Sequence, residues 1–470
     1  MELYKGYLLT VGLEVHVELK TASKIYCACP TTFGAEPNSN CCPVCTGMPG
    51  ALPVLNSGVV ALAIKAGLAT GCKIAECSGQ DRKNYFYPDL PKAYQISQYD
   101  RPLCFDGGVR IFTNEGEKTV EITRIHIEED AGKLIHGQGG ETYIDCNRCG
   151  VPLIEIVTAP CISSPEQAKA FLQKLRTLML YADVSDCKMN EGSMRCDVNL
   201  SVRRDGRPMG QRTEIKNLNS FAFVIKAIEY EYRRQVEVLE SGGAILQETR
   251  RFDEKTGRTE SMRQKESAAD YRFFPDPDLP PVRVTREEIE KIGKTLPMLP
   301  DARSALYKER YGLSDYDCGR ITAERWRADF FEAAATNTHA YKILANLTLE
   351  ELSLGNMITP LQAGRISMLL AEKKINSATA RRVIADLSGM EERSVDEYVK
   401  EKGLLQMGSR EELLPLVKEA LAANPRAVSD FKGGKKAAAG ALVGAVMKKT
   451  AGRGDPLLVE KLVLELLAAL

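Results

Sequence analysis

Strict alternation over residues 9–19 constrains the fold of this chain more than any other feature. In the run LTVGLEVHVEL every odd-numbered residue is apolar, and every even-numbered residue is polar or glycine. A repeat of two residues is typical of a β-strand whose two faces have different surroundings. We therefore predict a strand with one buried face, and with Glu14, His16 and Glu18 side by side on the other.

Residues 195–202 show the same alternation and predict a second strand. Its polar face would carry Arg195, Asp197, Asn199 and Ser201. Farther along, residues 221–239 place apolar side chains at helical spacing, and Ser220 or Asn219 can cap that helix. Glu214 thus lies just before the turn that leads into the helix.

The pattern of the chain changes near residues 273–281. The residues before this segment are rich in glycine, proline and short alternating runs, whereas leucine, alanine, glutamate and lysine recur at helical spacing after it. Its prolines can continue neither a helix nor a central strand, so they indicate an extended boundary segment. We predict an α+β fold with domains over residues 1–293, 294–405 and 406–470.

The charge of the chain gives no general signal for a nucleic-acid partner. Lysine plus arginine equals aspartate plus glutamate at 63 each. Residues 410–470 hold ten basic against seven acidic side chains, so any RNA contact must come from local patches. No secretory signal is visible, and no apolar stretch approaches the roughly 20 residues of a membrane span, which predicts a soluble, cytoplasmic protein without a membrane partner.

Four of the fourteen cysteines have the spacing of a metal site. Cys27 and Cys29 precede the pair Cys42 and Cys45, and four thiolates are the ligand set of a closed tetrahedral zinc site. Cys41 is an alternative to Cys42, which has the better spacing. We predict a structural Zn²⁺ at Cys27, Cys29, Cys42 and Cys45.

A further C-x-x-C pair, Cys146 and Cys149, has no second pair near it in the sequence. We interpret these two residues as incidental thiols, while a redox or metal role stays open.

Several charged residues outside the strands are candidates for a site. Glu155 lies in the apolar run VPLIEIV, where a carboxylate needs a cation or hydrogen-bond donors, so it is either paired with a core arginine or a metal ligand or acid. The consecutive acids Glu128, Glu129 and Asp130 form either a solvated loop or a cation site. Residues 82–92 are basic and aromatic, as in phosphate-binding loops and in many ordinary surfaces.

Familiar nucleotide and amidase motifs are absent from the sequence. There is no G-x-x-x-x-G-K-[ST], no G-x-G-x-x-G and no G-x-S-x-G. Any ATP site must therefore use another scaffold. If the reaction uses glutamine as its nitrogen source, another protein must release the ammonia.

Nine segments together resemble the B-subunit family of aspartyl/glutamyl-tRNA amidotransferases. They are VGLEVHVEL (11–19), FGAEPNSN (33–40), DRKNYFYPDLPKAYQISQYD (81–100), HIEEDAGK (126–133), GVPLIEIV (150–157), EGSMRCDVNLSVR (191–203), EIKNLNSF (214–221), QETRRFD (247–253) and DYRFFPDPDLPP (270–281). The resemblance implies a cradle-shaped catalytic domain distantly similar to glutamine synthetase, then an all-helical domain and a small helical tail domain.

The resemblance also implies the reaction. The enzyme would use ATP and Mg²⁺ to phosphorylate the side-chain carboxylate of glutamate on tRNA(Gln), of aspartate on tRNA(Asn), or of both. Ammonia from a glutaminase A subunit would then displace phosphate, while a C subunit holds A and B together. The absence of a large insertion favours this heterotrimer over the archaeal glutamate-specific relative.

By similarity, each candidate residue receives an expected role. Mg²⁺ would be held by His16, Glu129 and Glu155, with Glu14 and Glu128 close by. Asp197 and Glu214 would line the same polar floor, Lys83 would face phosphate or the activated acyl group, and Lys92 would stand on the ammonia route. The tRNA would be held by Lys432, Lys435, Lys436, Lys448, Lys449 and Arg453. Some relatives lack the four cysteines, so zinc would be structural, and the pair Cys146 and Cys149 departs from the family pattern.

Two rival functions remain beside this one. A zinc-containing tRNA-binding scaffold without catalysis would not need the acidic and histidine residues together. A free-standing carboxylate–amine ligase acting on a small molecule would not need the helical and tail domains.

Overall fold

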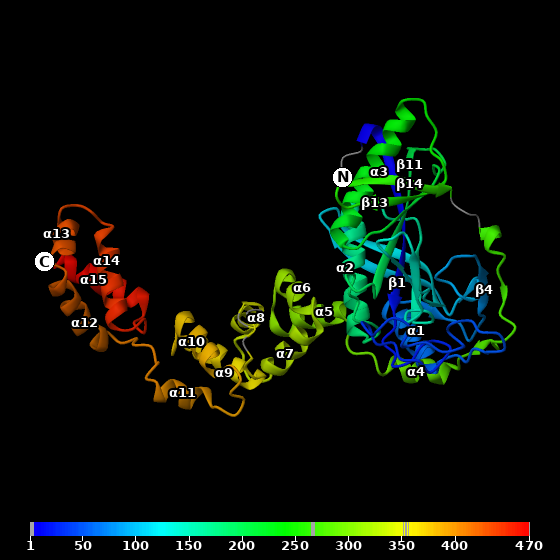
Figure 1. Ribbon diagram of the computed structural model, residues 1–470. Coiled ribbons are helices and arrows are strands. Elements are labelled where there is room, and N and C mark those ends of the chain that lie inside the picture. Colours follow the sequence, from blue (N-terminus) through cyan, green and yellow to red (C-terminus); the bar gives the residue numbers. More distant parts are fainter. Residues whose placement is uncertain (1–3, 265–267, 351, 353–354, 356, 470) are drawn as a thin grey trace. The chain divides into compact units, whose positions relative to one another are not determined.

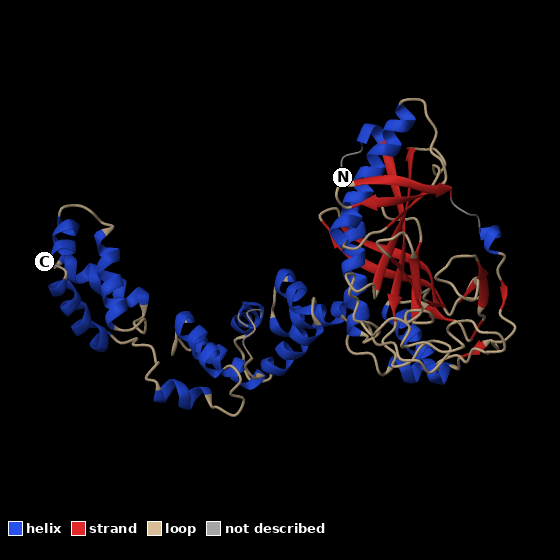
Figure 2. Cartoon of the chain, in the orientation of Figure 1, coloured by secondary structure: helices blue, strands red, loops and turns tan. Residues whose placement is uncertain are grey.

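A computed structural model describes residues 4–264, 268–350, 352, 355 and 357–469. The chain forms two compact units, Met1–Leu299 and Pro300–Leu470 (Figure 1). All the described strands lie in the first unit, and the described elements of the second unit are helical (Figure 2). The predicted α+β class is confirmed. No helix in the described part of the chain is long and apolar enough to cross a membrane.

A nine-stranded sheet forms the centre of the first unit. Its order is β14 (Arg258–Gln264), β13 (Glu248–Asp253), β12 (Thr213–Lys216), β11 (Met194–Arg204), β1 (Tyr7–Glu18), β10 (Pro152–Thr158), β7 (Gly116–Glu129), β6 (Cys104–Thr113) and β2 (Lys73–Ile74). All neighbouring strands are antiparallel except β12 and β13. The two predicted strands are β1 and β11, which pair with each other at the middle of the sheet.

Helices cover the apolar face of this sheet. They are α1 (Ser57–Ala69), α2 (Pro165–Tyr181) and α3 (Phe221–Glu240), and α4 (Arg286–Gly293) packs on α1. The odd-numbered side chains of β1, such as Val11 and Val15, are fully buried in the core beneath them. The hydroxyl of Ser220 accepts a hydrogen bond from the Phe223 amide at 3.2 Å, which confirms the predicted cap of α3.

Shorter strands form three small sheets in the same unit. Their strands are β15 (Phe274–Pro275), β4 (Asp81–Asn84) and β5 (Tyr94–Ser97) in one sheet, β16 (Val282–Arg283) and β3 (Cys77–Ser78) in the second, and β8 (Lys133–His136) and β9 (Thr142–Asp145) in the third. Two short 3-10 helices, Tyr4–Gly6 and Ala268–Tyr271, complete the unit. The proline-rich segment contains no helix, as predicted; it is extended at β15 and turns at residues 277–279. β15 lies at a sheet edge, where proline, which has no N–H to donate, is tolerated.

The second unit consists of consecutive short helices. They are α5 (Pro300–Tyr311), α6 (Asp315–Thr322), α7 (Arg325–Ala335), α8 (Tyr341–Glu350), α9 (Pro360–Ala371), α10 (Ser377–Leu387), α11 (Val395–Glu401), α12 (Arg410–Ala423), α13 (Pro425–Lys432), α14 (Ala438–Lys449) and α15 (Pro456–Ala468). Helices α12, α14 and α15 share a core of their own between Leu413 and Leu467. The predicted boundary between a helical domain and a tail domain, at residues 405 and 406, stays a prediction.

Candidate functional site

The register of the central strands brings the polar residues of five strands to one face of the sheet. Glu14 lies opposite Asp197, His16 lies opposite Glu155, and Glu155 lies opposite His126. Side chains of directly opposed residues project from the same face of a sheet. The alternation in β1 therefore places its acidic and histidine residues on the face away from helices α1 to α3.

His16, Glu128 and Glu155 form the first group on this face. One ligand atom from each lies within 4.8 Å of the others, which suits a single divalent cation. His16 Nε2 is 3.6 Å from Glu155 Oε2 and 4.0 Å from Glu128 Oε1. Glu128 and Glu155 are buried, and only His16 is partly exposed.

His126 belongs to the same group, although the sequence interpretation did not include it. Its Nε2 is 3.3 Å from Glu155 Oε2 and 3.4 Å from Glu128 Oε2, and its Nδ1 is buried without a hydrogen-bond partner. Burial opposes a charge on the ring, but the two carboxylates outweigh it and raise the pKa of His126 to about 9. The signal was in the sequence, because residues 126 and 128 must share a face of one strand.

Glu129 was predicted as a metal ligand, and the structure places it elsewhere. It follows Glu128 on β7, so its side chain leaves from the opposite side of the strand. Its Oε1 accepts a hydrogen bond from the Ile96 amide at 2.8 Å and forms an ion pair with Lys92. Glu128 therefore takes the position beside His16 and Glu155 that was expected for Glu129.

Lys83, on β4, lies near the first group. Its ammonium group is 5.2 Å from the ring centre of Tyr271 and 6.0 Å from that of Tyr85. Burial lowers the pKa of Lys83, but the nearby Glu128 and Glu155 outweigh this and raise it above the usual range. The structure thus places a cation beside this carboxylate group.

Glu14, Asp197 and Glu214 form a second group, again with ligand atoms within 4.8 Å of one another. Asn199 Nδ2 donates to Glu14 Oε1 at 2.8 Å, and the hydroxyl of Thr249 donates to Glu214 Oε2 at 2.9 Å. These hydrogen bonds orient the carboxylates, and a divalent cation is bound by such oxygen ligands.

Lys216 is the cation of the second group and was absent from the sequence interpretation. Its Nζ is 2.5 Å from Asp197 Oδ2 and 3.2 Å from Glu214 Oε1. The alternation in β12 puts Lys216 on the same face as Glu214, so the motif EIKN contained this signal.

The four predicted zinc ligands come together outside the sheet. The sulfur atoms of Cys27, Cys29, Cys42 and Cys45 lie within 4.8 Å of one another, and those of Cys42 and Cys45 are 4.0 Å apart. Tetrahedral Zn–S bonds of about 2.3 Å require sulfur separations of about 3.8 Å, so the cluster fits zinc. Cys41 is not a member of the cluster; its thiol donates to the Asn38 carbonyl at 3.2 Å.

Cys146 and Cys149 lie in a tight turn, where the Cys149 amide donates to the Cys146 carbonyl at 3.1 Å. Burial raises the pKa of both thiols above the usual range. Reactive cysteines instead have a lowered pKa, so neither thiol has the electrostatic surroundings of a reactive cysteine.

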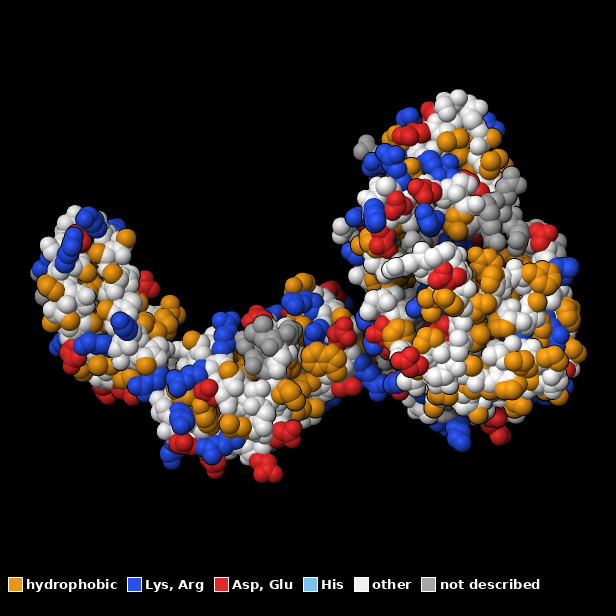
Figure 3. Space-filling model, viewed as in Figure 1, with side chains coloured by type: hydrophobic (Ala, Val, Ile, Leu, Met, Phe, Trp, Pro, Cys, Tyr) orange, Lys and Arg blue, Asp and Glu red, His pale blue; other side chains and the backbone are white. Residues whose placement is uncertain are grey.

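The predicted tRNA-binding residues are divided between the two ends of α14. Lys432, Lys435 and Lys436 precede the helix, and Lys448 and Lys449 end it, which separates the two sets by about 18 Å. Lys435 pairs with Asp430 and Lys449 with Glu419. Arg453 instead binds a backbone, because its Nη1 donates to the Gly403 carbonyl at 2.6 Å. Figure 3 shows basic side chains at several separate places on the C-terminal helices.

Comparison with known proteins supports one family over nearly the whole chain. Residues 9–290 match the family described as the GatB/GatE catalytic domain, and residues 327–467 match the GatB domain. A Caldicellulosiruptor bescii protein is 52% identical over 98% of both chains, and a Caldanaerobacter subterraneus protein is 50% identical over 98% of this chain and 99% of its own. A Brevibacillus brevis protein is 46% identical over 99% of both. Each relative is named as the B subunit of an aspartyl/glutamyl-tRNA(Asn/Gln) amidotransferase. On this evidence, the chain belongs to the B-subunit family of the aspartyl/glutamyl-tRNA(Asn/Gln) amidotransferases.

Proposed function

We propose that this chain is the ligase component of a glutamine-dependent tRNA amidotransferase. It phosphorylates the side-chain carboxylate of glutamate on tRNA(Gln), or of aspartate on tRNA(Asn), with ATP. It then amidates that carboxyl group with ammonia released by a glutaminase A subunit, in a heterotrimer completed by a C subunit. The names of the relatives and the chemistry of the polar face support this proposal.

The observation that carries the proposal is the presence of two ligand groups side by side on one sheet face. Glu14 of one group and His16 of the other are two residues apart on β1, a separation of about 7 Å along a strand. Mg²⁺ bound there would supply the positive charge that a phosphoryl group needs as it approaches a carboxylate. The residues suit this cation in type and spacing.

The two lysines complete the electrostatics of the face. Lys83 lies beside the first ligand group, and Lys216 contacts two carboxylates of the second. Both are placed to attract the phosphates of ATP and the carboxylate of the substrate, which are anions that repel each other. A face with acids alone would repel both.

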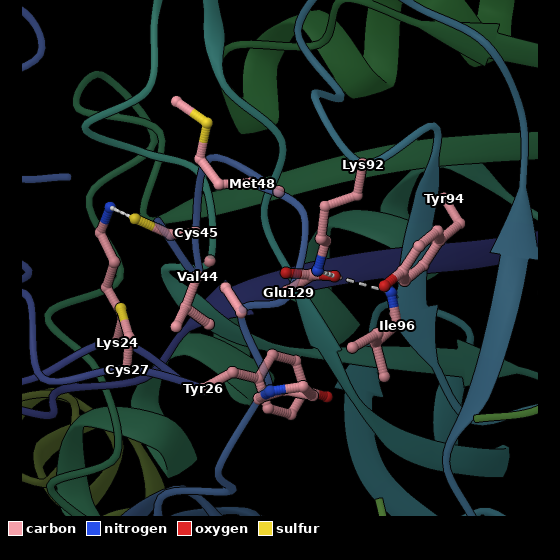
Figure 4. A pocket seen from close by; sticks show the side chains of 14 residues that line it. Lys24, Tyr26, Cys27, Val44, Cys45, Met48, Lys92, Tyr94, Ile96 and Glu129 are labelled. Carbon is pink, nitrogen blue, oxygen red and sulfur yellow. Dashed lines mark hydrogen bonds and ion pairs between the residues drawn. The ribbon is translucent and has the colours of Figure 1, made fainter. Parts of the chain in front are cut away.

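The pocket around Lys92 and Glu129 suits a route for ammonia. The lining of this pocket, a cavity of about 100 Å³, includes Lys92, Glu129, Tyr26 and Tyr94, and Figure 4 shows these side chains around it. Ammonia reacts only without its extra proton, and the Glu129 carboxylate can accept that proton while Lys92 holds the carboxylate in place. The Glu128 and Glu129 side chains leave β7 on opposite sides, so such a route would pass around the end of β7, at Glu129, to reach the phosphorylation site.

Phosphate release from ATP by the chain with its A and C partners tests the proposal. We expect turnover with Glu-tRNA(Gln) or Asp-tRNA(Asn) and none with free glutamate. Turnover on free glutamate would instead identify a small-molecule ligase, and no turnover with any substrate would identify a scaffold.

A pair of variants ties the reaction to the site. We expect Glu155→Gln to lower tRNA-dependent ATP turnover at least 100-fold, because it removes charge from the first ligand group. Glu121→Gln is the matched control, since Glu121 is an exposed glutamate on β7. Equal activities of the two variants would contradict the assigned site.

A further inference from the structure

Lys24 is a lysine in an unusual environment. Its side chain is fully buried, with 0% exposure. Its Nζ donates to Cys45 Sγ at 3.5 Å and to the Cys146 carbonyl at 3.2 Å, and Figure 4 shows it pointing at Cys45. In the described part of the chain, no ion pair joins Lys24 to a carboxylate.

A buried ammonium group needs a compensating charge. Moving a lysine charge out of water costs several kcal/mol unless an opposite charge lies nearby. The Cys146 carbonyl supplies only a partial charge. Four thiolates around one Zn²⁺ carry a net charge of about −2, and that cluster would stand directly beside the Lys24 ammonium group.

Lys24 also connects the cysteine cluster to the polar face of the sheet. Its amide donates to the Cys29 carbonyl at 2.9 Å, and the next amide, of Ile25, donates to the Gly150 carbonyl at 2.9 Å. Gly150 ends the turn that holds Cys146 and Cys149 and leads into β10, which carries Glu155. One residue therefore contacts both the cluster and the turn before β10.

We propose that Lys24 is a positioning residue for the zinc site. Its ammonium group offsets the negative charge of the zinc–thiolate cluster. Its hydrogen bond to the Cys146 carbonyl holds the cluster against the turn that precedes β10. This gives the turn a structural role: it offers a carbonyl acceptor that completes the surroundings of Lys24. The inference concerns zinc retention and is independent of the proposed reaction, because its tests need neither ATP nor tRNA.

The first test measures the loss of zinc from the full chain to a chelator. Lys24→Met keeps the length of the side chain and removes its charge. Hydrogen-bonding groups around metal ligands typically change metal affinity by about 10–100-fold, so we expect zinc to leave this variant at least ten times faster. Lys20→Met is the control. Lys20 is an exposed lysine just after the end of β1, and it pairs with Asp183. Equal rates in both variants, or a wild-type chain that binds no zinc, would overturn the proposal.

The second test separates a charge effect from a packing effect. We compare the melting temperature of the full chain with and without Lys24→Met, first in the zinc-loaded protein and then in a Cys42→Ser, Cys45→Ser background. We expect Lys24→Met to lower the melting temperature in the first and to raise it in the second, where the buried charge has lost its counter-charge. A similar decrease in both backgrounds would show that Lys24 only fills space.

Discussion

Glu128 and Glu129 are neighbours in the chain, yet their side chains lie in separate environments. Glu128 faces His16 and Glu155, whereas Glu129 binds Lys92 and the Ile96 amide. The separation follows from strand geometry alone, because successive side chains project from opposite faces. Two adjacent carboxylates can therefore serve cation binding on one side and proton acceptance on the other.

This separation predicts that Glu128→Gln and Glu129→Gln have different effects on the affinity of the chain for divalent cations. Removal of one charged ligand should weaken Mn²⁺ binding at least about tenfold in Glu128→Gln, whereas Glu129→Gln should bind Mn²⁺ as the wild type does. Titration of the full chain with Mn²⁺, followed by electron paramagnetic resonance, measures both. A tenfold loss in Glu129→Gln alone would restore Glu129 as the ligand.

Glu231, on α3, predicts a pH dependence of stability on the sheet side opposite the ligand groups. Its fully buried carboxylate accepts hydrogen bonds from Thr213, Thr259 and Arg234. Burial raises its pKa, but these donors and the arginine charge outweigh burial and lower the pKa below 4.5. A group with a lowered native pKa stabilises the fold above its unfolded pKa, and this contribution disappears as pH falls through the native pKa.

We therefore expect Glu231→Gln to reduce the free energy of unfolding of the first unit by about 2 kcal/mol at pH 7. The difference from the wild type should shrink as pH falls below 4.5. Urea unfolding at a series of pH values measures it. A difference that stays constant down to about pH 3 would show that the charge of Glu231 does not stabilise the fold.

At the scale of elements, local patterns predicted what each segment is, but not which segments meet. Alternation predicted β1 and β11, and the cap at Ser220 predicted the start of α3. Nothing local could show that β10 and β7 lie beside β1, because strand pairing depends on contacts between distant residues. For this reason Glu155 and Glu128 were found as acids in isolation. His126 and Lys216 were missed for another reason: each shares a strand face with a predicted acid two residues away, and that local signal was not used.

The packing of α9 on α7 gives a prediction that opposes helix propensity. Alanine usually stabilises a helix interior relative to glycine by about 1 kcal/mol. At Gly364 of α9, however, a Cβ atom would lie 2.7 Å from Asn337 Cβ and 3.0 Å from the Ala334 carbonyl oxygen. Backbone must move to admit it, so we expect Gly364→Ala to destabilise the second unit by about 1–3 kcal/mol.

Gly444→Ala is the matched control for this change. Gly444 lies within α14, and apart from its chain neighbours and the backbone of its own helix no described atom lies within 4 Å of the position of its Cβ. Because the added methyl group meets no neighbour here, the higher helix propensity of alanine should make this variant slightly more stable than the wild type. Calorimetry of the full chain measures both variants, and a stabilising Gly364→Ala would show that α7 and α9 pack less closely.

At the scale of the whole molecule, composition could not locate a contact with RNA. The balance of 63 basic and 63 acidic residues excludes binding through overall charge, and the run of tail lysines suggested a local patch. The fold divides that run between the ends of α14, and ion pairs engage Lys435 and Lys449. Spacing along the sequence could not reveal this division or these ion pairs, because both depend on how α12 to α15 pack.

Lys436 and Lys448, exposed at opposite ends of α14, provide the test of tRNA binding at this scale. If both contact phosphates, Lys436→Glu and Lys448→Glu should each weaken tRNA binding and reduce the slope of log affinity against log salt by about one. Lys226→Glu makes the same charge change on α3, which covers the sheet face opposite the ligand groups, and should leave the slope unchanged. Filter binding at several salt concentrations measures all three. An equal loss in all three variants would mean that only the net charge matters, whereas a loss in one lysine variant alone would assign tRNA binding to that end of α14.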